Sequence, residues 1–450
     1  MILAFLSGLF GLFCIGREVC VIFRAQQIRI SNLFLIMYGI TYGVVLSLWL
    51  GLIEYDISSF KGIFRNKSIW FDYSGDGISL TALWFLAAFV GYWAFRFTNR
   101  KRCEKKCDLG RMLLTFDTAN VPSWRRFQIT GVICLVIGII SFCIWVYGWG
   151  GYWNLFLHAP EIRNGSYGIR NPVAFFAKPA QVVAVTTLIF LLLIKQGKNS
   201  WFNIGGVILS IIFSLLYYLA KDGRMTMAMF LLVVLFLWND MFDKHIFVSK
   251  YLIKFAFFFV FFVVFVLNMN TITAFLRDDV SMASGDKTII ENIFGELAYI
   301  YVTGQISVGH CIEYGSPMLI AHDVGLALFA WIPNALTPKG LINLWDYNTY
   351  LIAGSKATAQ SPCDLISASL YDLGILGPIV MPAFWGWAIK KLEEIYEKRR
   401  TPFLIIIYCS LSLPVVRVVN YSMFYSTIAS LFFLFLFIVI FKLVGNTKWS

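Results

Sequence analysis

Long apolar runs, each close to the length of a membrane-crossing helix, alternate with short polar connections along the chain. A helix needs about 20 largely apolar residues to cross the hydrocarbon core of a bilayer. The pattern predicts eleven spans, of which the seventh and tenth are short for a crossing. The predicted spans are residues 2–23, 33–53, 79–97, 128–149, 173–194, 202–220, 225–238, 251–268, 365–389, 403–415 and 422–441.

The longest connection, residues 269–364, carries most of the mass expected outside the membrane. A structureless loop of this length is uncommon in a compact protein. Residues 289–312 mix apolar and polar positions, which predicts an amphipathic helix at the membrane interface. Residues 317–332 are apolar but short, and a hairpin of spans built from these two segments would raise the count to thirteen. Residues 331–360, rich in Pro, Gly, Asn and Trp, predict an ordered cap over an opening.

Composition supports the same fold class. The chain is 59% hydrophobic and only 14% charged, whereas soluble domains carry about a quarter charged residues. The first apolar segment lacks a basic start and a small-residue cleavage site, so it is expected to be retained as a span. The sequence therefore predicts an all-α, polytopic transmembrane helix bundle forming one integral membrane domain over residues 1–450.

The net charge of +12 lies mainly in short loops beside the apolar runs. Loops on one predicted side hold 21 Lys and Arg residues in 80 positions, against 12 in 154 positions on the other side. The basic side is expected to be cytoplasmic, which puts residues 269–364 and the N-terminus outside and the C-terminus inside. The basic run 100–106 is interpreted as a topology anchor, so nucleic acid is not an expected partner.

The nine cysteines show no metal-binding spacing. Cys103 and Cys107 have no second pair nearby, and most of the others lie within spans, where Cys behaves as a small hydrophobe. Cys311 and Cys363 both fall on the predicted outer side, and the sequence leaves a disulfide between them open.

A set of cations recurs at the predicted outer membrane boundary, the side that should be poor in them. Basic residues at this depth are costly and are functional by default, although lipid headgroups or nearby acids can also hold them. As a set they predict a binding site for a polyanion at headgroup level, such as a lipid-linked diphosphate. The seven residues are Arg163, Arg170, Lys178, Lys221, Arg224, Arg277 and Arg417.

The acids on the same side are scattered, and only Asp278 and Asp279 are adjacent. Divalent cations need several converging carboxylates, so neither a metal nor another cofactor is predicted. The sequence also lacks a Gly-rich phosphate loop, which argues against a nucleotide substrate.

The chain resembles the Wzy-type polymerases of O-antigen and capsule repeat units over roughly residues 150–430. The matching pieces are the Gly223-Arg224 turn, the Trp331-Ile332-Pro333 stretch reaching Pro338, a Ser- and Gly-rich span after Ser361-Pro362, and Arg417 before the last span. The resemblance implies a GT-C-like arrangement in the bacterial inner membrane. Undecaprenyl-diphosphate-linked oligosaccharides and membrane lipids are the implied partners, together with a chain-length regulator and a flippase.

The implied reaction is metal-independent transfer of a glycan from polyprenyl diphosphate to a sugar hydroxyl of a second lipid-linked unit. A base near that hydroxyl is expected, and the type and predicted side of each residue select Asp364, Glu296 and His310, with Asp346 as a further candidate. Structural roles compete for these residues. Asp364 stands at a predicted helix start, where a carboxylate favours the helix dipole, and His310 could be an interfacial hydrogen-bonding group.

Three other functions compete with the polymerase. An O-antigen ligase uses the same donor and transfers it to a lipid core. A flippase or other transporter usually shows internal repeats, and none is visible here. A membrane O-acyltransferase needs a His within the membrane, and none of the four His residues falls in the middle of a predicted span.

Overall fold

The computed structural model describes residues 1–25, 27–55, 74–100, 124–164, 167–168, 170–198, 200–221, 224–238, 289–332, 336–338, 340–353 and 361–446. These residues form helices and connections, with no β-strand among them. The helices are α1 (Ile2–Ala25), α2 (Ile30–Gly39), η1 (Ile40–Val45), α3 (Leu46–Tyr55), α4 (Gly75–Asn99), α5 (Trp124–Tyr147), α6 (Tyr152–Leu157), α7 (Ala159–Asn164), η2 (Ala174–Phe176), α8 (Ala177–Ala180), α9 (Val183–Lys195), α10 (Trp201–Ala220), α11 (Arg224–Trp238), α14 (Ile289–Glu313), α15 (Ile320–Leu328), α16 (Leu344–Ala353), α17 (Leu365–Leu373), η4 (Gly374–Leu376), α18 (Gly377–Lys398), α19 (Pro402–Arg417), α20 (Phe424–Ala429) and α21 (Phe432–Asn446).

Eight helical segments of the described chain are long and apolar enough to cross a membrane, which makes the protein a polytopic helical membrane protein. They match eight of the eleven predicted spans. The predicted seventh and tenth spans correspond to the shorter helices α11 and α19, and the predicted eighth span, residues 251–268, lies outside the described residues. The eight segments are Ile2–Ala25, Ile30–Gly51, Gly75–Asn99, Trp124–Tyr147, Ala174–Lys195, Trp201–Ala220, Leu365–Lys398 and Phe424–Gly445.

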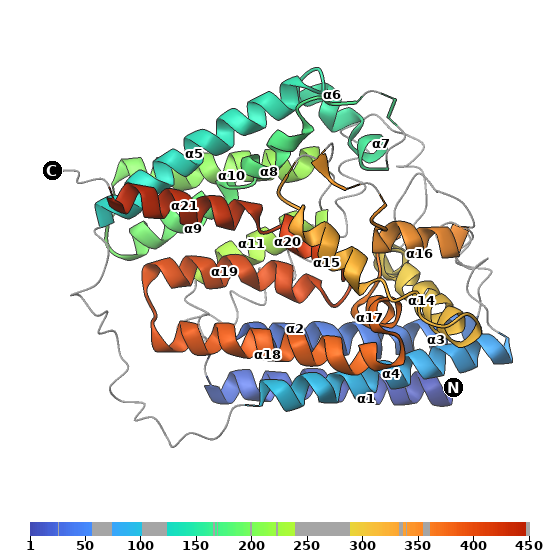
Figure 1. Ribbon diagram of the computed structural model, residues 1–450. Helices are drawn as coiled ribbons and strands as arrows, with labels where there is room; N and C mark the ends of the chain where they lie inside the picture. Colours follow the sequence, from blue (N-terminus) through green and yellow to red (C-terminus); the bar gives the residue numbers. More distant parts are fainter. Residues whose placement is uncertain are drawn as a thin grey trace.

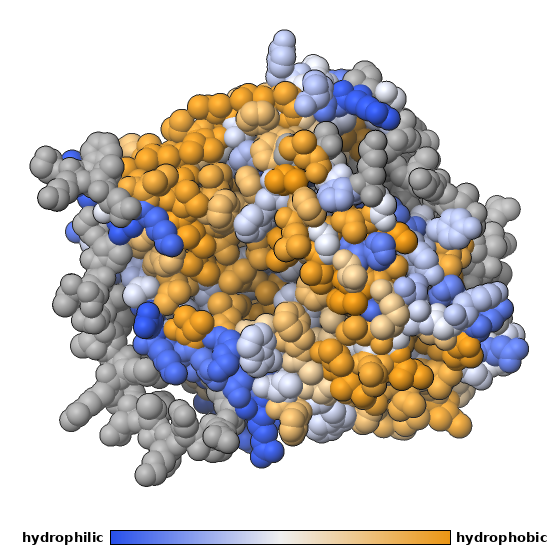
Figure 2. All heavy atoms as spheres, viewed as in Figure 1, coloured by the Kyte–Doolittle hydropathy of each residue, from blue (hydrophilic) through white to orange (hydrophobic). Residues whose placement is uncertain are grey.

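The spans run side by side, and their ends collect at two opposite ends of the bundle (Figure 1). We call the right-hand end of this view the cap end, because α6, α7, α14, α16 and α17 gather there. The opposite end, where α18 leads into α19, is called the basic end. The surface between them is mostly apolar, and hydrophilic residues concentrate near the α18–α19 connection (Figure 2).

The second span and the span predicted at 365–389 each change helix type along their length. The second span contains a π-helical segment, η1, between α2 and α3, and π-helical turns are frequent at functional sites. The span predicted at 365–389 is divided at Gly374, whose φ of 61° ends α17 before η4 and α18 begin. The first interruption lies beside the turn that follows α19, where Thr41 contacts Asn420, and the second lies beside Ser316.

The helix predicted at 289–312 is present as α14, and its stretch from residue 300 to residue 308 is packed inside the protein. Residues 300–305 are all buried, and Gln305 donates to Gly77 O and Thr81 Oγ1 of α4, both at 2.9 Å. A helix lying on the membrane surface would keep a polar face toward water, and α14 keeps none in this stretch. Neither α14 nor α15 is among the eight span candidates, so the described chain gives no support to a hairpin of spans here.

The disulfide that the sequence left open is not formed. Cys311 and Cys363 are both free thiols. Cys363 is completely buried beside Leu319 and Tyr371, and the Cys311 thiol instead points to the carbonyl of Leu370 at 3.6 Å.

Candidate functional site

Three of the seven predicted cations come together at the cap end. Lys178 belongs to α8, Lys221 follows the last residue of α10, and Arg417 is the last residue of α19. Lys221 interacts electrostatically with both Lys178 and Arg417. Three helices distant in sequence therefore bring three positive charges into one place, which we call the cation cluster.

Each cation of the cluster is held by neighbouring groups. The Lys178 ammonium donates to the carbonyls of Ala330 and Ile332, at 2.9 and 3.3 Å. The Lys221 ammonium lies 5.2 Å from the centre of the Tyr217 ring, and the Arg417 guanidinium lies 4.7 Å from that of Tyr421. An aromatic face attracts a cation without neutralising its charge, so both side chains keep their positive charge beside the rings.

Lys221 has a strongly perturbed charge. Its side chain reaches solvent, yet the surrounding protein desolvates the ammonium and, with the nearby positive charge of Arg417, lowers the pKa to about 8. None of the described carboxylates forms an ion pair with it. A bound anion would remove the repulsion between Lys221 and Arg417, which is the electrostatic condition expected of an anion site.

The remaining four predicted cations are not assigned to the cluster. Arg170 is exposed, and no contact joins it to the other three. The side chains of Arg163 and Arg224 and the whole of Arg277 lie outside the described residues.

Asp364, the first candidate base, is the N-cap of α17. Its Oδ1 accepts hydrogen bonds from the backbone N–H groups of Ile366 and Ser367, at 2.9 and 3.1 Å, and from the Tyr42 hydroxyl at 2.8 Å. The carboxylate is completely buried, and burial raises its pKa although these donors oppose the rise. This geometry gives Asp364 a capping role at the helix start, and a substrate hydroxyl could reach it only after the surrounding helices had moved.

His310, the second candidate base, lies in the last turn of α14 and is only partly buried. Its Nε2 is 2.8 Å from the hydroxyl of Tyr347 in α16, and the Tyr314 ring lies 5.3 Å away. A half-exposed imidazole held by a tyrosine can accept a proton from a bound hydroxyl. The side chain of Glu296, the third candidate, lies outside the described residues.

Helix α16 links the imidazole to the cation cluster. Tyr347 faces His310, and Trp345, two residues earlier, makes an edge contact with Tyr421 at 6.5 Å. The ring of Tyr421 in turn lies under the Arg417 guanidinium. Neither Tyr347 of α16 nor Tyr421 of the turn after α19 could be selected from the sequence, because their neighbours follow only from the fold.

Polar groups inside the second span were also missed from the sequence. Thr41 and Tyr42 of η1 are buried and bind the turn after Arg417. Thr41 and Tyr42 could have been noticed in the sequence as two successive polar side chains within an apolar run, which is unusual in a span.

Asp323 is a further buried acid near the cap end. It accepts hydrogen bonds from the backbone N–H groups of Phe424 and Tyr425, at 2.7 and 3.3 Å. Burial raises its pKa to about 6, against the effect of these two donors. In the described part of the chain, no group of three His, Cys, Asp or Glu side chains is arranged to hold a metal ion.

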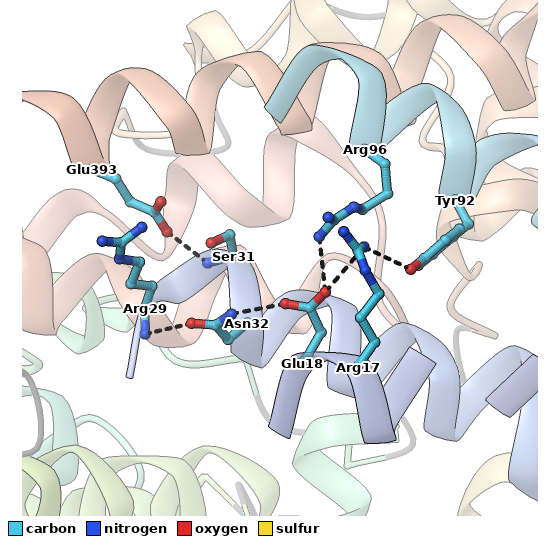
Figure 3. A network of polar contacts seen from close by, with 8 residues as sticks. All are labelled: Arg17, Glu18, Arg29, Ser31, Asn32, Tyr92, Arg96 and Glu393. Atoms are coloured by element: carbon cyan, nitrogen blue, oxygen red, sulfur yellow. Dashed lines mark hydrogen bonds and ion pairs between the residues drawn. The ribbon is translucent and has the colours of Figure 1, made fainter. Parts of the chain in front are cut away.

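A second polar network lies toward the basic end, away from the cation cluster. The buried Glu18 carboxylate of α1 contacts Arg96 at 2.8 Å, Arg17 at 3.6 Å and Asn32 at 2.8 Å (Figure 3). Each carboxylate oxygen has a partner from another helix, so the network joins α1, α2 and α4. Its complete pairing is typical of a structural contact.

Comparison with known proteins identifies no relative: no protein-family model, no curated protein and no solved structure matches the chain.

Proposed function

We propose that this protein polymerises lipid-linked oligosaccharide repeat units, with the cap end facing the outer side of a bacterial cytoplasmic membrane. The observation that carries the proposal is the convergence of Lys178, Lys221 and Arg417, which has the charge needed for the diphosphate of a polyprenyl carrier. The mostly apolar surface around the bundle suits a substrate whose lipid tail stays in the bilayer.

The proposed reaction is a displacement at the anomeric carbon of the donor glycan. The acceptor hydroxyl oxygen forms a bond to that carbon, and the bond between the carbon and the diphosphate oxygen breaks. Its electron pair leaves on polyprenyl diphosphate, and the hydroxyl proton passes to a base. The cation cluster would stabilise the negative charge that grows on the leaving oxygen.

His310 is the proposed base. His310 and Asp346 both reach solvent, whereas Asp364 is buried. We choose His310 because the Tyr347 hydroxyl holds its ring. If Nε2–H donates to the Tyr347 oxygen, Nδ1 is left with a lone pair for the acceptor hydroxyl.

The direct test is synthesis by the purified protein in lipid vesicles. Given lipid-linked repeat units and excess chelator, the wild-type chain is expected to produce a ladder of polymers on a gel. Lys221→Ala and Arg417→Ala should each lower the rate by about tenfold to a hundredfold, since each removes a charge-assisted contact to phosphate. Lys391→Ala is the matched control, because Lys391 is exposed and pairs with Glu394 on α18.

Several outcomes would contradict the proposal. A full ladder from both cluster variants would remove the diphosphate site, and loss of the ladder in chelator with rescue by Mg²⁺ would show a metal-dependent reaction. Transfer of a single finished chain to a lipid core, without a ladder, would identify a ligase instead.

A further inference from the structure

The turn between α19 and α20 is tied to the second span by side chains of the π-helical segment. Thr41 Oγ1 donates to Asn420 Oδ1 at 2.7 Å, and the Tyr42 hydroxyl lies 3.3 Å from the carbonyl of Val419. Thr41 is 1% exposed and Tyr42 is fully buried. These are contacts between parts of the chain almost 380 residues apart.

The same turn begins at Arg417. The backbone N–H groups of Asn420 and Tyr421 both donate to the carbonyl of Arg417, at 3.1 and 2.9 Å. The Arg417 guanidinium packs over the ring of Tyr421. A shift of Asn420 would therefore move both the backbone of Arg417 and the ring that orients its side chain.

Close packing holds the π-helical segment itself in place. A Cβ atom on Gly43 would lie 2.3 Å from the Cα of Gly11 in α1, so the two backbones touch. Since α1 cannot approach η1 any more closely, Thr41 and Tyr42 present their hydroxyls from a fixed support.

We propose that Thr41 and Tyr42 are positioning residues, which hold the turn after α19 so that Arg417 stays beside Lys221. This inference rests on the proposed function only for its effect on catalysis, because the positioning itself can be measured without substrate. Neither residue would touch the diphosphate.

The test compares Thr41→Val, which removes the hydroxyl at nearly constant volume, with Thr41→Ser, which keeps it. The control is Thr130→Val in α5, because Thr130 is equally buried and its hydroxyl has no hydrogen-bond partner among the described residues. All variants are first matched for membrane yield and thermal unfolding midpoint.

The first measurement is the titration of Lys221. The acetylation rate of its amino group is determined over a pH series by mass spectrometry, and this rate reports the pKa. If Arg417 withdraws in Thr41→Val, the pKa of Lys221 should rise from about 8 by roughly half a unit, since the repulsion falls with distance. Arg417→Gln should give an equal or larger rise. Thr41→Ser and Thr130→Val should titrate as the wild type does.

The second measurement is polymer synthesis, in which Thr41→Val should lower kcat/KM roughly tenfold and Thr41→Ser should restore it. The positioning role would be overturned if the pKa of Lys221 rises in Arg417→Gln but is unchanged in Thr41→Val. If wild-type protein makes no polymer but the titration shifts as expected, the proposed function fails and the positioning role stands.

Discussion

At the scale of single residues, Lys221 connects a measurable pKa with a proposed role. A lysine binds a diphosphate as a cation only while it is protonated. The pKa of Lys221 is lowered to about 8 by desolvation of the ammonium and by the charge of Arg417. The pH dependence of kcat/KM reports the groups of the free enzyme. Above pH 8, kcat/KM is therefore expected to fall about tenfold per pH unit.

Lys221→Arg provides the control for this prediction. Arginine stays charged throughout the range, so the alkaline fall should disappear even if the rate below pH 8 is lower. A variant that keeps the same alkaline fall would show that another group titrates there.

At the scale of helices, the Glu18 network predicts how α1 is held in the bundle. Arg96→Met should leave the buried Glu18 carboxylate with only the more distant Arg17 as a cation. Removing one partner of a buried ion pair is expensive, so the expected loss of unfolding free energy is about 3 kcal/mol. The measurement is thermal unfolding of the purified protein in detergent.

The double variant separates the ion pair from general packing. Glu18→Gln combined with Arg96→Met should cost less than the sum of the two single changes, because no buried charge is left uncompensated. Lys391→Met, which breaks only an exposed pair with Glu394, should cost well under 1 kcal/mol. Strict additivity of the two Glu18 network variants would contradict a coupled pair.

The helices themselves were largely predictable, because an apolar run of span length leaves few alternatives. Their interruptions were not. The π-helical segment η1 packs against α1 and the turn after α19, and the break at Gly374 lies beside Ser316. For the site, the presence of cations at the membrane boundary of the cap end could be predicted from the sequence alone. Which cations meet, and the burial of Asp364, follow only from packing between distant helices.

At the scale of the whole molecule, the connections that the structure describes lie at two opposite ends of the bundle (Figure 1). Which end faces outward remains a prediction from the excess of Lys and Arg in the loops of the basic end. The proposed function depends on it, since translocated lipid-linked glycans are available only on the outer side.

A pair of single cysteines tests this orientation. Leu336, 69% exposed at the cap end, and Lys398, exposed at the end of α18, would each be changed to Cys in a parent whose nine cysteines are replaced by alanine. In cells with only the outer membrane permeabilised, a membrane-impermeant maleimide should label Leu336→Cys and leave Lys398→Cys unlabelled until the inner membrane is ruptured. Because the two positions lie at opposite ends of one bundle, the reverse result would place the cation cluster in the cytoplasm. A diphosphate ligand there could equally be a nucleotide sugar, so transfer between two lipid-linked glycans would lose its basis even if Lys221 and Arg417 still bind an anion.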